Sequence, residues 1–441
     1  MIFRCRVLDT PEDPFHGGRL RVETDAGLHV TADGQIADRG AYEDVRARHP
    51  TDPVHDLTDG LLLPGFVDTH VHFPQARIIG ALGMPLLEWL DRCALPEEAR
   101  FADVGYARAV AKEFLDGLIG VGTTTALVFG AHFAPAVDAL FEAASAIGLR
   151  VTSGLVVSDR LVPAELRTTA QRAYDEALAL ASRWHGTGRN RYAVMPRFAL
   201  SCSDALLASC AALHAAVPGS WITSHLNENV AEIAQVRELF GCSYVSSYDR
   251  HGLVGPQSVF AHNVHPERAE LERLGDARAV VAHCPTSNAS LGSGLFPLGR
   301  HLAHGVRVAL GCDVGAGTGY SLFKEGLQVY FCQRQLGADG VALGPSHLLY
   351  LATAAGAAAL GLEDQIGDLG VGKSFDALWL RPPPGSPLAA ALRRADTPEQ
   401  ALARAFALAT SYDVAGVWIG GVATKPLGAG PRQREGTDGG R

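Results

Sequence analysis

The sequence predicts an α/β protein built on a (β/α)8 barrel of the TIM type, with a small β-sandwich domain beside it. Two observations predict this fold. Strand-like apolar runs recur through the middle of the chain and mostly alternate with helix-like segments, as in barrels of parallel strands. Short alternating segments at both ends predict the strands of a smaller domain. We expect residues 65–367 to form the barrel, and residues 1–64 and 368–424 to form the sandwich.

The two flanking segments alternate apolar and polar residues around turn signals. The first contains "LRVETDAGLHVTADGQIADRG", and the second contains "GDLGVGKSFDALWL" and later "GVWIGGVATK". Alternation of this kind is typical of half-buried strands joined by turns, and we expect the two segments to pair with each other. Residues 425–441 are polar and rich in glycine, which predicts a disordered tail.

The middle segment contains eight apolar runs that we expect to be the barrel strands. They are "LLLPGFVDTHVHF", "VGTTTALVF", "RVTSGLVVS", "RYAVMPRFAL", "SWITSHLNE", "SVFAHNVH", "ARAVVAHCP" and "VRVALGCDVG". Segments such as "APAVDALFEAASAIG" and "ENVAEIAQVRELFG" lie between them and end on glycine, as helices often do.

Composition excludes several classes of function. The 441 residues carry a formal net charge of -9 and no lysine-arginine run, so no nucleic-acid partner is expected. Apolar stretches fall short of the roughly 18 residues that span a bilayer, and the first residues lack a signal peptide, so no membrane partner is expected. The eight cysteines form no Cys-x-x-Cys pair, which argues against a cysteine metal site and indicates thiols in a reducing cytoplasm.

Polar residues fall at the ends of four of the predicted strands. His70 and His72 alternate at the end of the first run, and alternate residues of a strand point to the same face. The fifth, sixth and eighth runs carry His225, His262 and Asp313. Because a barrel builds its active site at the carboxyl ends of its strands, we expect these groups to converge. Imidazoles with one carboxylate suit a single Zn²⁺ or a similar ion, Fe²⁺ being the alternative.

The remaining histidines and the fourth run complete this reading. The fourth run carries Arg197 and no lysine, so a carbamylated lysine bridging two metals is not available, and one metal per subunit is expected. Several histidines lack the register of the strand ends and are expected to be structural, namely His132, His251, His265, His283 and His304.

With these residues in hand, the chain resembles the metal-dependent amidohydrolase superfamily and, within it, the guanine deaminase family. The matching stretches are "PGFVDTHVHFPQ", "PLLEWLDRCALPEEARF", "GTTTALVF", "PRFALSCS", "SHLNEN", "AHCPTSNASLGSG" and "LGCDVGAGTGYS", which span roughly residues 61–325. His-x-His and the late aspartate are shared across the superfamily, whereas "HFPQ", "LLEWL" and "PRF" are more specific. The stretch "AHNVH" is a small departure outside the ligand itself.

The resemblance implies a set of site residues. His70, His72, His225 and Asp313 would hold the metal, and His262 would contact its water or the substrate. Glu228, three residues after His225, would be the proton shuttle, and the purine would be bound by Gln75, Arg197 and Phe198. Relatives also suggest a homodimer.

The resemblance implies hydrolytic deamination of guanine to xanthine and ammonia, and the residues are suited to this chemistry. A metal lowers the pKa of its bound water to about 7, and the resulting hydroxide can attack C2, the amidine-like carbon. Glu228 would protonate N3, Asp313 would accept the remaining proton, and His262 would stabilise the tetrahedral oxygen. Arg197 has only donors and fits the O6 carbonyl, Gln75 both donates and accepts, and Phe198 and Trp89 offer flat apolar surfaces.

Other interpretations stay open at this stage. Arg197 could be a structural ion-pair partner, and Trp89 could be a core residue. Within enzymes, the alternative substrate is another amino-heterocycle such as 8-oxoguanine, a pterin or a triazine, because one barrel supports many chemistries. A different class is a non-catalytic assembly protein on the same fold, which would be expected to lack some of the ligands or the shuttle.

Overall fold

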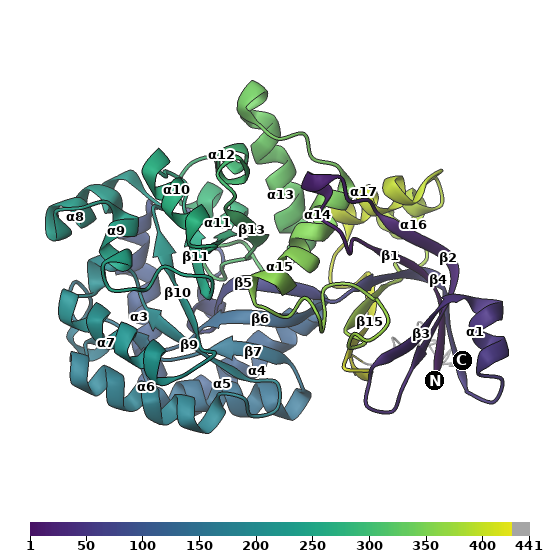
Figure 1. Cartoon of the computed structure of the whole chain (residues 1–441), viewed down its shortest axis with the longest axis horizontal. Coiled ribbons are helices and arrows are strands. Elements are labelled where there is room, and N and C mark those ends of the chain that lie inside the picture. The colour runs from purple at the N-terminus through teal and green to yellow at the C-terminus, as the bar shows by residue number, and fades with distance from the viewer. Residues whose placement is uncertain (426–441) are drawn as a thin grey trace, which may run out of the picture.

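The eight apolar runs of the middle segment form the parallel strands of a barrel, in the computed structural model that describes residues 1–425. Neighbours in the sheet follow the order of the chain (Figure 1). The strands are β5 (Phe66–His72), β6 (Thr123–Phe129), β7 (Arg150–Ser153), β9 (Arg191–Pro196), β10 (Trp221–Leu226), β11 (Ser258–His262), β12 (Val280–His283) and β13 (Arg307–Leu310), with the short β8 (Val156–Val157) beside β9.

Backbone hydrogen bonds just beyond β13 bring the last strand against the first. The amide of Asp313 donates to the carbonyl of His70 at 2.9 Å, and the amide of His72 donates to the carbonyl of Val314 at 3.0 Å. Every residue of β5, β6, β10 and β11 is buried, which is the pattern of parallel strands covered on both faces. The nearly closed barrel confirms the expected fold class.

Helices that lie between the strands, or that follow the last strand, surround the barrel (Figure 1). They are α4 (Val104–Gly120), α5 (Ala134–Ile147), α6 (Ala170–Trp184), α7 (Asp204–Ala216), α8 (Val230–Phe240), α9 (Tyr244–Asp249), α10 (Arg268–Asp276), α11 (Pro285–Ser290), α12 (Leu298–Ala303), α13 (Leu322–Gln335), α14 (Pro345–Ala352) and α15 (Ala354–Ala359). Their ends carry the expected signals. The side chain of Asn229 caps α8, and Gly148 and Gly241 end α5 and α8 in the left-handed region that favours glycine.

A long connection of short helical turns joins β5 to α4. Its elements are η2 (Phe73–Ile78), α2 (Leu86–Trp89), the π-helical turn η3 (Leu90–Ala94), α3 (Leu95–Ala99) and η4 (Arg100–Ala102). Because this connection leaves the carboxyl end of β5, it brings its side chains to the active-site end of the barrel.

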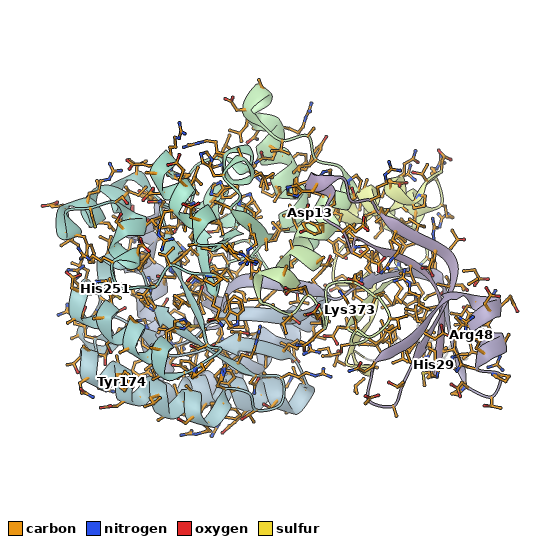
Figure 2. The ribbon with its side chains drawn as sticks, in the orientation of Figure 1. Asp13, His29, Arg48, Tyr174, His251 and Lys373 are labelled. Carbon is orange, nitrogen blue, oxygen red and sulfur yellow. The ribbon has the colours of Figure 1, made fainter. Side chains whose placement is uncertain are left out.

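Strands from both ends of the chain form a second, mixed sheet. Its order is β16 (Val422–Lys425), β15 (Val414–Ile419), β14 (Ala377–Leu380), β4 (Val54–Pro64), β1 (Ile2–Asp9), β2 (Arg21–Val30) and β3 (Ile36–Ala41). The helix α1 (Tyr42–Arg48) lies beside β2 and β3 at the far end of the molecule, where Figure 2 labels Arg48. Arg48 makes a bidentate ion pair there with Asp38 at 2.7 and 2.9 Å.

The small domain is one continuous curved sheet, whereas a sandwich was expected to hold two. Three strand spacings of about 4.8 Å separate β1 from β15 along the sheet order. The rings of Phe3 and Trp418 on these strands nevertheless lie 5.6 Å apart between centroids, and Phe375 stacks on Phe3 at 4.3 Å. The sheet therefore curls around an apolar core, to which strands from both ends of the chain contribute.

Two helices interrupt the segment after the barrel, where strands and turns alone were expected. They are α16 (Pro387–Leu392) and α17 (Pro398–Leu408), and both begin with proline after a capping side chain, Ser386 or Thr397. Phe406 of α17 packs against Phe323 of α13 with ring centroids 5.4 Å apart. The segment thus contributes helices that pack on the barrel as well as strands of the small sheet.

The predicted tail falls almost wholly at residues 426–441, outside the part of the chain that the structure describes. Among the helices of residues 1–425, none combines the length and the apolar character that crossing a membrane requires.

Candidate functional site

A pocket opens at the carboxyl ends of the barrel strands and collects the residues singled out in the sequence. Its lining includes nine of them, His72, Gln75, Trp89, Arg197, Phe198, His225, Glu228, His262 and Asp313. The tenth, His70, is buried next to the pocket, with its Nε2 atom 3.1 Å from that of His72. The connection between β5 and α4 supplies one wall through Leu86, Trp89 and Leu90.

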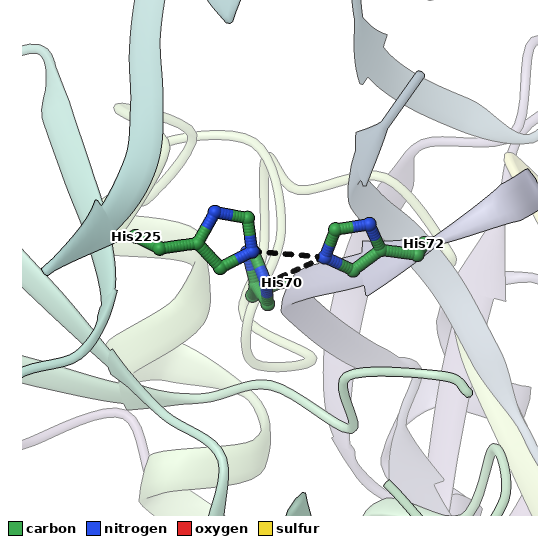
Figure 3. Close-up of side chains that lie close together, drawn as sticks. All are labelled: His70, His72 and His225. Carbon is green, nitrogen blue, oxygen red and sulfur yellow. Dashed lines mark hydrogen bonds between the residues drawn. The ribbon is translucent and has the colours of Figure 1, made fainter. Parts of the chain in front are cut away.

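Three imidazoles and a carboxylate converge at the base of the site. Figure 3 shows the rings of His70, His72 and His225 turned toward one another, and the Nε2 atom of His72 lies 3.1 Å from the Nε2 atoms of both others. Asp313 Oδ1 lies 3.4 Å from the Nε2 atoms of His70 and His72. The two histidines of β5 meet because they alternate along the strand, and His225 arrives from β10 across the barrel.

The protonation of these groups fits a metal ion. Burial, and then the charge of His70, lowers the pKa of His72 to about 3, and burial also lowers the pKa of His225 well below its usual value. The Nδ1 atom of His225 donates to the carbonyl of Arg197 at 2.5 Å, which leaves its Nε2 lone pair facing the other rings. The neutral forms of His72 and His225, together with His70 and one carboxylate, offer the nitrogen and oxygen donors that a Zn²⁺-type ion takes, so the residues fit such a group.

Strained backbone holds two of the site residues at the strand ends. His262 has φ 74° and Asp313 has φ 47°, in the left-handed region that non-glycine residues rarely adopt. Each such residue costs about 1–3 kcal/mol and persists where its surroundings fix it. Asp68 is one such support, because its Oδ1 atom accepts from the amides of His70 and Cys312 at 3.1 and 3.2 Å.

Glu228 follows β10 and lies against His262 and Ser293. Its Oε1 atom accepts from Ser293 Oγ at 3.2 Å, and its Oε2 atom lies 3.4 Å from His262 Nε2. Burial, and then the charge of Asp313, raises the pKa of Glu228 to about 8. The Nδ1 atom of His262 donates to Asn288 Oδ1 at 3.0 Å, so its Nε2 atom is the one presented to Glu228. The stretch "AHCPTSNASLGSG" contains both Asn288 and Ser293, to which the sequence assigned no role.

A buried polar group lies on the other side of the pocket, and its centre is Glu98 of α3. Arg197 donates to Glu98 through Nη2 at 2.8 Å and through Nε at 3.2 Å. Gln75 donates to the same carboxylate at 2.8 Å, and its Oε1 atom accepts from the amide of Gly315 at 3.2 Å. Arg197 therefore lines the pocket and is also the ion-pair partner of Glu98.

The neighbours of this group were only partly anticipated. His132, expected to be structural, places its Nδ1 atom 3.5 Å from Glu98 Oε2, and burial lowers its pKa to about 4. Phe198 lies with its ring centroid 5.5 Å from the guanidinium carbon of Arg197. Trp89 is 2% exposed, and its indole N–H finds no hydrogen-bond partner within residues 1–425. The sequence missed Glu98, although it lies in the quoted stretch "PLLEWLDRCALPEEARF".

Comparisons with known proteins agree with this geometry. The model of the Amidohydrolase family matches residues 61–424. The chain is 58% identical to a protein of Deinococcus radiodurans named "Probable guanine deaminase", over 95% of this chain and 97% of that protein. The solved E. coli guanine deaminase superposes with a TM-score of 0.91 at 36% identity, covering 96% of this chain and 98% of that one. A guanine deaminase from C. acetobutylicum, solved with guanine bound in its active site, gives a TM-score of 0.89 at 27% identity, over 96% and 99% of the two chains. This chain therefore belongs to the amidohydrolase family and is similar, within that family, to proteins named guanine deaminase.

Proposed function

We propose that this enzyme hydrolyses guanine to xanthine and ammonia. The observation that carries the proposal is the composition of the pocket, which is lined by His72, His225 and Asp313 of the His/His/His/Asp group and also by the buried side chains of Arg197 and Gln75. High identity to proteins named guanine deaminase over nearly the whole chain supports it.

The metal would be held by the converging ligands. His70, His72, His225 and Asp313 form the donor set, and we infer one Zn²⁺ per subunit, with Fe²⁺ as the alternative ion. When bound, such an ion lowers the pKa of a water molecule to about 7 and so supplies a nucleophile at neutral pH.

The protein groups around C2 of guanine would move the protons. Addition of water at C2 pushes electrons onto N3, which Glu228 can protonate because its raised pKa keeps the carboxyl protonated near neutral pH. Burial raises the pKa of Asp313, but contact with His70 lowers it by more, so the net pKa lies well below its usual value. Asp313 therefore stays ionised and can accept the hydroxyl proton. Asp313 would then pass this proton to the amino group, which leaves as ammonia, and Glu228 would regain the proton it gave to N3 from the added water. His262, directed at Glu228 and Asp313, would hold the oxygen of the tetrahedral carbon.

Recognition of the purine is assigned to the polar group around Arg197. The guanidinium uses Nε and Nη2 for Glu98, and Nη1 has no hydrogen-bond partner among residues 1–425. Its N–H groups can donate to the O6 carbonyl of guanine. Arginine has no acceptor atom, so it cannot accept a hydrogen bond from the amino group of adenine. Gln75 can complete the contacts with this edge, and Phe198 and Trp89 can pack on the ring faces.

A substrate panel tests the proposal. Purified enzyme is assayed for ammonia release with guanine beside adenine, cytosine, pterin, 8-oxoguanine and a triazine. We expect the largest kcat/KM with guanine and accumulation of xanthine. Turnover of another heterocycle with guanine left unchanged would reject guanine as the substrate, and inertness toward the whole panel would favour an assembly protein.

Two finer expectations complete the proposal. We infer a cytoplasmic enzyme, because all eight cysteines are free thiols and disulfides persist mainly in oxidising compartments. We also infer a homodimer, which light scattering of the purified protein would check.

A further inference from the structure

Glu98 is the common acceptor for the two side chains that face the polar edge of the pocket. Its Oε1 atom accepts from Gln75 Nε2 and from Arg197 Nη2, each at 2.8 Å, and its Oε2 atom accepts from Arg197 Nε. The three side chains come from separate elements, η2, α3 and the end of β9. All three residues are at most 4% exposed, so water does not compete for these hydrogen bonds.

The hydrogen bonds to Glu98 leave a defined set of donors for a ligand. The planar fork of Arg197 is held along the edge formed by Nε and Nη2, which fixes the direction of Nη1. Gln75 is fixed in the same way, because Nε2 must face the carboxylate while Oε1 accepts from Gly315. Without Glu98, the guanidinium of Arg197 would lose the acceptor that fixes its direction. The amide of Gln75 could also turn over, which would exchange the positions of its oxygen and nitrogen.

The charges of the group are also matched. Burial alone would raise the pKa of Glu98, but the charge and hydrogen bonds of Arg197 lower it to about 2, so the carboxylate is ionised. His132 approaches the same carboxylate, but burial keeps its imidazole neutral, which leaves Arg197 as the cation paired with Glu98. A pair whose charges cancel can stay in a dry pocket, where an unpaired charge would be very costly.

We propose that Glu98 is a positioning residue for substrate recognition, which holds Arg197 and Gln75 so that their remaining donors face the oxygen-bearing edge of the purine. This inference rests on the proposed function. Glu98 does not line the pocket, so it acts through Arg197 and Gln75 rather than by touching the substrate.

The central test is Glu98→Gln, with Glu97→Gln as its matched control. Glu97 is the neighbouring buried carboxylate and bonds instead to Arg100 and Tyr106. A glutamine at position 98 offers one oxygen where two are used, and its amino group faces a donor. We expect KM for guanine to rise about 10- to 100-fold, the value of a charge-assisted hydrogen bond, while kcat changes less than about threefold. KM for 2-aminopurine, which lacks O6, should change much less. The control variant Glu97→Gln should keep the wild-type KM and kcat for guanine.

A double-mutant cycle separates positioning from folding. Glu98→Gln leaves the cation of Arg197 unpaired, whereas Glu98→Gln with Arg197→Met removes both charges and should fold even if the single variant does not. In the Arg197→Met background, we expect the further Glu98→Gln change to raise KM for guanine by no more than about threefold, through Gln75 alone.

Three results would overturn the inference. They are an unchanged KM in Glu98→Gln, equal losses on guanine and 2-aminopurine, or full additivity in the cycle. A wild-type enzyme that does not deaminate guanine would instead reject the proposed function, so the two failures are distinguishable.

Discussion

At the residue scale, the site sets buried carboxylates to opposite protonation states. Burial raises the pKa of Glu228 to about 8, with a further contribution from Asp313. Glu98 is equally buried, but Arg197 lowers its pKa to about 2. Two carboxyl groups with such different pKa values can take different roles, one as a proton donor and the other as a permanent negative charge. Glu228 is thereby suited to transfer a proton, and Glu98 is suited to stay ionised and hold its partners.

Glu228→Gln tests the proton transfer directly. The amide keeps the size and can keep the hydrogen bond with Ser293, but it cannot relay a proton. Loss of general acid–base catalysis typically costs about 10²–10⁴ in rate, and we expect a fall in kcat of at least that size. Metal content, measured by elemental analysis, should be unchanged. A variant that loses its metal would show that Glu228 is a ligand, and Glu238→Gln, exposed on α8, serves as the control.

Arg197→Met tests recognition of the O6 edge. The variant keeps part of the packing of the stem and deletes the donors, so kcat/KM for guanine should fall about 10- to 100-fold. The loss should be much smaller for 2-aminopurine, which carries the C2 amino group without O6. Steady-state kinetics on the two substrates give the ratio, and a misfolded protein would lower both alike. Equal losses with metal still bound would remove Arg197 from the purine site.

At the element scale, a buried glutamate joins two helices behind the site. Glu325 of α13 accepts from the amide of Thr286 in α11 at 3.0 Å and from its hydroxyl at 2.7 Å. The same helix α11 carries Asn288, which fixes the ring of His262. Burial raises the pKa of Glu325 from its ordinary value of 4.5 to about 8. The carboxyl therefore stays protonated in the folded protein at pH values where the unfolded chain has already released its proton.

Glu325→Gln should reveal this difference as a dependence of stability on pH. Below pH 4.5, Glu325 is protonated in both the folded and the unfolded chain, so its raised pKa does not affect stability. Between pH 4.5 and about 8 the unfolded chain releases this proton while the folded protein keeps it, so the fold is destabilised increasingly as pH rises. Relative to the wild type, we expect the free energy of unfolding of Glu325→Gln to rise by about 1.4 kcal/mol per pH unit across this window. Urea unfolding at several pH values measures it, with the exposed Glu399→Gln as the control. A difference independent of pH would contradict the raised pKa.

At the scale of the whole molecule, the barrel assembles ligands that lie far apart in the chain. His70 and His72 come from the first strand, His225 from the middle, and Asp313 follows the last. The hydrogen bonds that bring β13 against β5 run through the backbone of His70, His72 and Asp313 themselves. Ion binding and closure of the barrel should therefore be coupled, because a ligand that binds only the folded state stabilises it.

Removal of the metal should consequently affect both activity and stability. We expect a strong chelator to abolish turnover and to lower Tm, and added Zn²⁺ to restore both. Zinc at 100 times its dissociation constant would add about 2.7 kcal/mol to the free energy of unfolding. Activity assays and thermal scans of stripped and reloaded protein measure the two effects. Full turnover by protein shown to be free of metal would reject the proposed chemistry.

Local patterns in the sequence determined the barrel and the converging histidines. A strand that is buried on both faces appears in the sequence as a short apolar run. The parallel strands of a barrel all end on the same side. Polar residues at the ends of separate runs can therefore be placed together before any contact is known. The resemblance predicted, position by position, Glu228 as the proton shuttle and Gln75, Arg197 and Phe198 as contacts of the purine, and these roles stay predictions. The starts of α16 and α17 also carry a local signal in the sequence, a capping residue followed by a proline.

The tertiary structure alone decided how the side chains of the site are paired. Arg197 meets Glu98 across 99 positions of the chain, and Glu228 meets Ser293 across 65. No short-range sequence pattern predicts either pair. The first depends on where the connection after β5 places Glu98 over the barrel, and the second on where the turn after α11 places Ser293. The single curved sheet was decided in the same way, because alternation shows which face of a strand is buried but not which strand covers it.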